Sequence, residues 1–137
     1  MRANLVAACS DAGIDVNRGA ARRFLDNTLL DTAGVQVRFP ESSARLDGNL
    51  VDGGLVSRDG GRLEPGDNRV TPIALTYLGY RPQRWLFADP ATLDLRWKDG
   101  APLRGGGAAA GPDLCGVTRP PAAAYGAFED FAACLRR

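Results

Sequence analysis

Three aspartates, Asp89, Asp94 and Asp99, recur at intervals of five residues and form the most regular acidic set in this sequence. Two carboxylates can perform general acid–base chemistry when a fold holds them close together. Along one β-strand, however, a spacing of five places neighbours on opposite faces, about 16 Å apart. Asp89 and Asp99 also belong to turn signals, Asp-Pro and Lys-Asp-Gly, so only Asp94 is expected on a strand. This stretch therefore does not predict a catalytic pair.

The chain of 137 residues contains no histidine. This excludes Ser-His-Asp and Cys-His catalysis as well as histidine-based zinc sites. Lys98 is the only lysine, and its expected place at the tip of a turn does not favour the burial that a Schiff-base lysine needs. We expect no cofactor, no metal and no enzymatic activity. A carboxylate-dependent enzyme stays open as an alternative, if the fold brings two acids together.

A cluster of aromatic and arginine side chains is the strongest binding candidate. Tyrosine, tryptophan and arginine are favoured at interfaces because each combines a large contact area with a directional polar group. Alternation along residues 92–97 places Trp97 in the core, whereas Trp85 follows a turn and has no such assignment. The predicted binding residues are Tyr80, Arg81, Arg84, Trp85 and Arg96.

The charge balance bears on the class of partner. Seventeen basic residues face sixteen acidic ones, for a net charge of +1, and residues 69–104 form the only locally basic third. This balance argues against a general nucleic-acid or membrane-surface binder. No apolar run is long enough to span a membrane. The abundance of Ala, Gly and Arg, which have GC-rich codons, indicates a bacterial source with a GC-rich genome.

Three cysteines, Cys9, Cys115 and Cys134, bear on the compartment. No Cys-x-x-Cys motif is present, so the spacing does not favour a redox or zinc-ribbon site. Cys115 and Cys134 would close a short loop as a disulfide, which is expected if the protein is exported. The alternative is three buried free thiols that pack as small hydrophobic groups. Both a cytoplasmic and an exported, periplasmic location remain open.

The elements that must position these residues are predicted from periodicity. Residues 2–13 and 15–34 are rich in Ala and Leu, and the latter places Ala21, Phe24, Leu25 and Leu29 on one helical face. We expect two N-terminal helices. A helix-turn-helix that binds DNA is the alternative, although the acidic side chains of the second helix argue against it.

The middle of the chain is predicted to be a sheet. Residues 35–39 alternate as a strand, and three Asp-Gly pairs then mark turns. Residues 73–78, 83–88 and 91–97 are expected as further strands. Residues 120–137 are expected as a helix that docks an aromatic stripe of Tyr125, Phe128 and Phe131 on the sheet.

These elements predict an α+β fold in a single domain spanning residues 1–137. An antiparallel sheet of about five to seven strands over residues 35–104 would pack against two N-terminal helices and one C-terminal helix. No internal repeat is expected, and the glycine- and alanine-rich residues 104–113 are expected as a flexible loop.

Size, absent histidine and the Tyr/Arg/Trp cluster together favour a small non-enzymatic bacterial protein that binds another protein, as an inhibitor or immunity protein does. Three alternatives stay open. The first is a small-ligand-binding domain with an apolar pocket between the sheet and the C-terminal helix. The others are the carboxylate-dependent enzyme and the DNA-binding protein described above.

Overall fold

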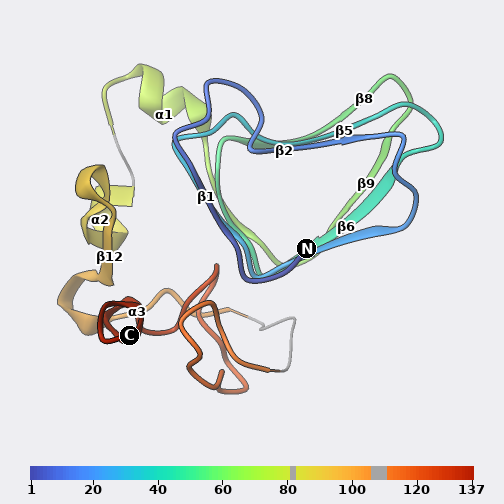
Figure 1. Cartoon of the computed structure of the whole chain (residues 1–137). Coiled ribbons are helices and arrows are strands. Elements are labelled where there is room, and N and C mark those ends of the chain that lie inside the picture. Colours follow the sequence, from blue (N-terminus) through green and yellow to red (C-terminus); the bar gives the residue numbers. More distant parts are fainter. Residues whose placement is uncertain (81–82, 106–110) are drawn as a thin grey trace.

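The chain up to Thr71 winds into a parallel β-solenoid of about three turns. Figure 1 looks along its axis and shows a three-sided coil, with the remainder of the chain packed outside one side. The computed structural model describes residues 1–80, 83–105 and 111–137. The predicted α+β fold with an antiparallel sheet is therefore wrong, since each turn contributes one short strand to each of three parallel sheets.

The three sheets are built from strands of three to five residues. The first contains β1 (Leu5–Ala7), β4 (Thr28–Leu30), β7 (Leu50–Asp52) and β10 (Arg69–Thr71). The second contains β2 (Ile14–Asn17), β5 (Gly34–Arg38) and β8 (Gly54–Arg58). The third contains β3 (Arg22–Leu25), β6 (Ser43–Asp47) and β9 (Arg62–Pro65).

Two hydrophobic clusters lie on either side of the first sheet. The interior of the coil is filled from all three sheets, by residues such as Leu29, Val37 and Leu46. Side chains on the outer face of the first sheet, among them Leu30 and Leu50, pack against the C-terminal part of the chain. The first sheet is thus buried on both faces, which explains why all three residues of β4 are buried.

A column of asparagines marks one corner of the coil. Asn4, Asn27, Asn49 and Asn68 precede the four strands of the first sheet, and each Nδ2 donates to the Oδ1 of the next at 3.0, 2.9 and 2.7 Å. Successive members are 23, 22 and 19 residues apart. The prediction that the chain lacks an internal repeat is therefore wrong.

The two predicted N-terminal helices are strands and corners. Phe24 on β3 and Leu29 on β4 both point into the coil, so their helix-like spacing reflects two strands on either side of a corner. Ala3, Ala8 and Ala21 have φ between 50° and 57°, a left-handed conformation that no α-helix contains. Without these helices, the DNA-binding alternative loses its structural basis.

The Asp-Gly pairs do form turns, but these are corners of a coil rather than hairpins. Gly48, Gly53 and Gly60 have φ of 71°, 114° and 84° and link consecutive strands of the coil. Positive φ suits a hairpin turn and a coil corner equally well. The predicted strand at residues 35–39 is present as β5, with Val35 and Val37 pointing inward.

Beyond the coil, two of the predicted strands are helices. Residues 73–78 contain α1 (Ile73–Tyr77), and α2 (Gln83–Leu86) precedes a short strand, β11 (Phe87–Asp89). The 3₁₀ turn η1 (Pro90–Thr92) leads into β12 (Asp94–Trp97), which pairs antiparallel with β11, and η2 (Lys98–Gly100) follows. Trp97 is buried as predicted, whereas Leu93 is exposed rather than inward-facing because it occupies the corner before β12 with a φ of 60°.

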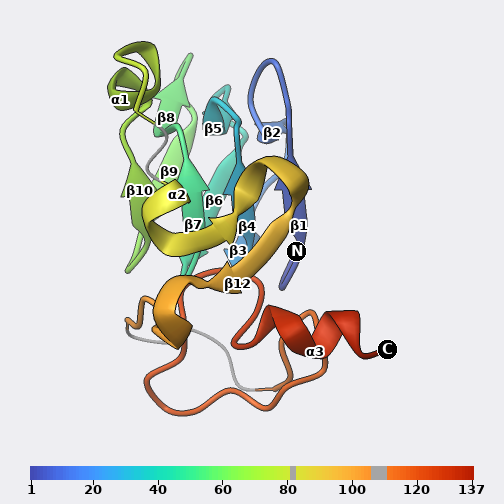
Figure 2. The same ribbon diagram turned by 90° about the vertical axis from the view of Figure 1, so that its left-hand side faces the viewer.

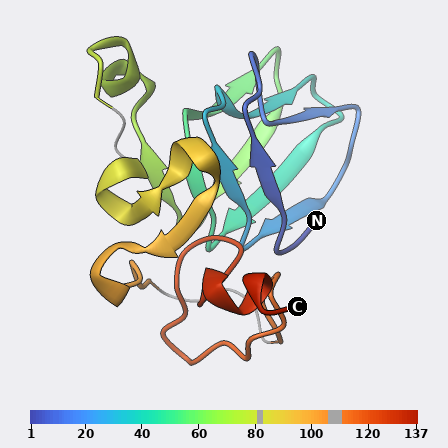
Figure 3. The same cartoon turned by 60° about the vertical axis from the view of Figure 1, so that its left-hand side comes forward.

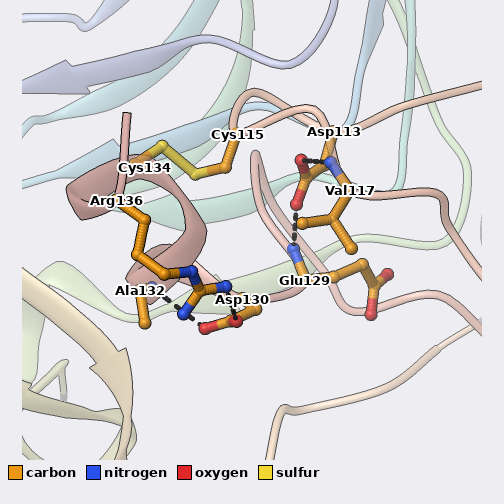
Figure 4. Close-up of a disulfide and its surroundings, with 8 residues drawn as sticks. All are labelled: Asp113, Cys115, Val117, Glu129, Asp130, Ala132, Cys134 and Arg136. Carbon is orange, nitrogen blue, oxygen red and sulfur yellow. Dashed lines mark hydrogen bonds and ion pairs between the residues drawn. A yellow bond between two sulfur atoms is a disulfide. The ribbon is translucent and has the colours of Figure 1, made fainter.

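The C-terminal part contains one helical turn, α3 (Phe131–Leu135), where a longer helix is predicted. Gly126 has a φ of 90°, so the aromatic spacing of Tyr125 and Phe128 is not helical, although Phe128 is buried. The disulfide between Cys115 and Cys134 ties α3 to the preceding loop (Figure 4), and Cys9 is a free thiol. The predicted loop at 104–113 includes residues 106–110, which lie outside the described residues.

Hydrogen bonds that buried carboxylates accept hold this irregular segment together. Asp113 accepts from the backbone N–H groups of Val117 and Glu129 at 2.7 and 2.6 Å (Figure 4). The carboxylate of Glu129 pairs with Arg104 at 2.9 Å and accepts from the backbone of Ala124 at 2.7 Å. These hydrogen bonds hold residues 113–129 in place without regular secondary structure. Figures 2 and 3 show that α2, β12 and this segment lie beside the first sheet.

Candidate binding site

A group of exposed apolar side chains lies on the segment that links the coil to β11. Tyr77 is 82 % exposed, Leu78 71 %, Tyr80 54 % and Trp85 62 %. We call these four residues the aromatic surface. They come from α1, the turn after it and α2, which stand away from the coil at one side (Figure 1).

Local sequence explains why this segment is helical and then turns. Pro72 precedes α1, where its fixed φ is compatible with the start of a helix. Gly79 ends the element with a φ of 82°, and the amide of Tyr80 donates to the carbonyl of Leu75 at 2.9 Å. This turn brings the rings of Tyr80 and Trp85 to 6.5 Å between centroids, in a tilted arrangement.

The structure brings together some of the predicted binding residues. Tyr80, Trp85 and the exposed Arg84 lie on one segment, while Arg81 falls outside the described residues. Arg96 lies elsewhere, on β12, where its guanidinium holds the Asp94 carboxylate at 2.8 and 2.6 Å. This pairing lowers the pKa of Asp94, so Arg96 is occupied by a neighbour on its own strand.

Behind α2 lies a pocket of about 390 Å³, which we call the α2 pocket. One wall is the end of the first sheet, and the other is α2 with η1 and the residue after it. Its volume is in the range of small-molecule sites. The lining residues are Ala7, Ala8, Leu30, Asp31, Asp52, Gln83, Arg84, Pro90, Ala91 and Leu93.

Four of the lining residues are polar or charged. The Oδ2 of Asp52 accepts from the backbone N–H of Asp31 at 2.8 Å, which fixes that carboxylate against the neighbouring coil. Gln83 is 5 % exposed, and its Nε2 donates no hydrogen bond to any described residue. Asp31 and Arg84 are exposed. The lining therefore includes a buried amide with an unpaired donor.

A second pocket, of about 620 Å³, lies between β12 and α3. This is near the place predicted for an apolar ligand pocket, but its lining includes the charged Arg96, Lys98, Arg104 and Glu129. The indole Nε1 of Trp97 also lacks a hydrogen-bond partner among the described residues. The lining therefore combines apolar area with several charged side chains.

Two of the three carboxylates considered for catalysis are neighbours, because Asp89 pairs with Asp94 in the register of β11 and β12. Asp94 is also held in an ion pair by Arg96, and Asp99 lies in η2. Asp26 is fully buried 3.8 Å from Arg2, and burial raises its pKa. It lines neither of the two pockets. Among the described residues, no group of three or more His, Cys, Asp or Glu side chains is placed to hold a metal ion.

Sequence reasoning missed the polar residues of the α2 pocket. The register that pairs Leu29 with Val51 places Asp31 one position beyond Asp52, so the two acids do not share a position of the coil and no repeat in the sequence marks them. Gln83 carried no sequence signal, because its burial depends on how α2 packs against the first sheet.

No described helix is long and apolar enough to cross a bilayer. Comparison with protein families, with curated proteins and with solved structures finds no match to this chain.

Proposed function

We propose that this protein is a non-enzymatic binding protein whose aromatic surface contacts another protein. The observation that carries the proposal is the exposure of Tyr77, Leu78, Tyr80 and Trp85 on one short segment outside the coil. Contiguous apolar groups on a soluble surface mark interaction sites, and tryptophan and tyrosine dominate the binding energy of protein interfaces.

The environment of this surface favours a protein partner over a nucleic acid. Single-stranded nucleic acid needs aromatic platforms within a basic groove that follows the backbone. Here Arg84 is the sequence neighbour of Trp85, and the Nζ of Lys98 donates to the Arg84 carbonyl at 3.5 Å. The net charge of the whole chain is only +1. An apolar surface with a few polar groups at its rim is typical of a protein interface.

The partner class that this proposal implies is an enzyme or toxin whose activity falls on binding, as for an inhibitor or immunity protein. Support comes from the hydrogen-bonded coil that precedes this segment, since a preorganised scaffold lowers the entropic cost of association. The disulfide and the buried carboxylate contacts fix the C-terminal part in the same way.

The test begins with affinity capture from the cells that express the protein, using wild type and the double variant Tyr80→Ser/Trp85→Ser. The captured partner is then purified, and its Kd for each variant is measured by calorimetry. We expect a loss of at least about 30-fold, because hot-spot residues contribute about 2 kcal/mol or more.

Leu135→Ser is the matched control, since Leu135 is 63 % exposed on α3, away from the aromatic surface. It should leave the Kd unchanged. An unchanged Kd for the Tyr80→Ser/Trp85→Ser variant, with its urea midpoint retained, would refute the proposal. A salt-dependent affinity for single-stranded nucleic acid in place of a protein would refute it as well.

A further inference from the structure

Two amides of the C-terminal part donate hydrogen bonds to one corner of the coil. The N–H of Gly126 donates to the carbonyl of Gly48 at 2.8 Å, and the N–H of Ala127 donates to the Oγ1 of Thr28 at 2.8 Å. We call residues 112–129 the docked segment. It covers apolar side chains on the outer face of the first sheet, which belong to the same hydrophobic cluster as Phe128. The two amides therefore report whether this segment lies on the coil.

Asp26 is buried at the same corner, directly before Asn27 of the asparagine column. It is 0 % exposed, and neither of its carboxylate oxygens accepts a hydrogen bond from any described residue. The buried carboxylates of Asp113 and Glu129, in contrast, each accept a backbone hydrogen bond at 2.6 or 2.7 Å. An ionised carboxylate without such bonds has lost its water without compensation, so its charged form is unfavourable in this place.

Four charged groups surround Asp26, two of each sign. Arg2, on the coil, has its Nε 3.8 Å from the Oδ2 of Asp26. Arg119, on the docked segment, adds a second positive charge, and its side chain is 1 % exposed. Glu129, on the docked segment, and Asp47, at the end of β6, add negative charge. Burial raises the pKa of Asp26, the two arginines lower it in part, and the two acids raise it further.

Both arginines donate their hydrogen bonds elsewhere. Arg119 donates to two backbone carbonyls of the docked segment at 3.1 and 2.7 Å, and Arg2 donates to the carbonyl of Pro112 at 3.2 Å. The Nε atoms of the two guanidinium groups are buried without an acceptor among the described residues. They offset the charge of Asp26 through space, but they do not replace the hydrogen bonds that water would donate to it.

We propose that Asp26 is a proton-dependent switch for the docking of residues 112–129 on the coil. The neutral, protonated carboxyl is compatible with its buried place, so the segment stays docked while Asp26 holds its proton. Ionisation favours states in which the segment lifts and water reaches the carboxylate. In those states the outer face of the first sheet, including Leu30 and Leu50, is uncovered. The switch concerns the interface under the segment and does not depend on the aromatic surface.

Amide hydrogen exchange of the full chain, followed by NMR between about pH 5 and about pH 8, tests the switch. After correction for intrinsic exchange rates, we expect the protection of Gly126 and Ala127 to fall by about tenfold or more as pH rises. The N–H of Gly54, which donates to the carbonyl of Ala33 within the coil, should lose less protection. An equal fall at Gly54 would assign the effect to unfolding of the whole chain and overturn the proposal.

Two variants identify the group that titrates. Asp26→Asn keeps the shape of the side chain and should remove the pH dependence of the two amides. Asp15→Asn, at an exposed carboxyl on β2, is the matched control and should retain it. Persistence of the dependence in Asp26→Asn would overturn the proposal. So would protection that falls towards acid, because protonation of Asp113 or Glu129 would act in that direction.

One measurement needs no variant and applies even if Asp26→Asn fails to fold. The carboxyl carbon of Asp26 can be titrated by NMR in the wild-type chain, and its midpoint should lie above the ordinary value of 3.8. The loss of protection at Gly126 and Ala127 should follow the same midpoint. A midpoint at or below 3.8, or one that differs from that of the two amides, would contradict the switch.

Discussion

Asn49 is the residue on which the column of asparagines depends most. It is 1 % exposed, and its Oδ1 accepts from both the backbone N–H and the Nδ2 of Asn27 at 2.9 Å. Its own Nδ2 donates to the carbonyl of Phe24 at 2.9 Å and to Asn68 at 2.7 Å. Asn49→Ala removes the acceptor of two buried donors at once, and each such donor costs about 1–3 kcal/mol. We therefore expect the free energy of unfolding to fall by about 2–6 kcal/mol.

Equilibrium unfolding in urea measures this loss. With an m-value of about 2 kcal/mol/M, the midpoint should fall by about 1–3 M at an unchanged slope. Asn4→Ala is the matched control at the open end of the column. It removes the Nδ2 donor to Asn27 at 3.0 Å but keeps the backbone N–H that donates to the same oxygen at 3.1 Å. It should cost only about 0.5–1.5 kcal/mol. If Asn49→Ala costs no more than Asn4→Ala, the column does not stabilise the coil as argued.

Three further outcomes are expected. Replacing Cys115 and Cys134 together by serine should lower the free energy of unfolding by about 3 kcal/mol in urea titrations, because their disulfide closes a loop with a separation of 19 residues. Burial raises the pKa of Asp26, so the folded state holds its proton more tightly, and the resulting stabilisation is lost as pH rises through the folded pKa. Asp26→Asn should therefore be more stable than wild type at pH 7, with an advantage that shrinks towards pH 3.8 in pH-dependent urea titrations. Gly34→Ala should lower the thermal midpoint and cost about 2 kcal/mol or more, because Gly34 has a φ of 96° and an added Cβ would meet the backbone of Gly54; an unchanged midpoint would contradict the close approach of these coils.

The candidate site was predictable only in part. Tyr80, Arg84 and Trp85 were recognised from residue type alone, and the structure places all three exposed on one segment. Arg96 was grouped with them on the assumption of neighbouring strands, but it lies on β12 in an ion pair with Asp94. The α2 pocket escaped prediction because its walls come from three coils and from α2, which are distant in sequence.

Sequence by itself predicted one strand, the burial of one tryptophan and several turns, but not the strands and helices on either side of them. The alternation of β5, the burial of Trp97 and the turns at Gly48, Gly53 and Gly60 all follow from side-chain periodicity and from the freedom of glycine at positive φ. Which strand pairs with which, and in which direction, was decided only by the tertiary structure. The same alternation and the same turns are compatible with an antiparallel hairpin and with a parallel coil. The direction of strand pairing therefore depends on which parts of the chain cover the strands. Here the column of asparagines and a second apolar cluster outside the first sheet stabilise the parallel coil.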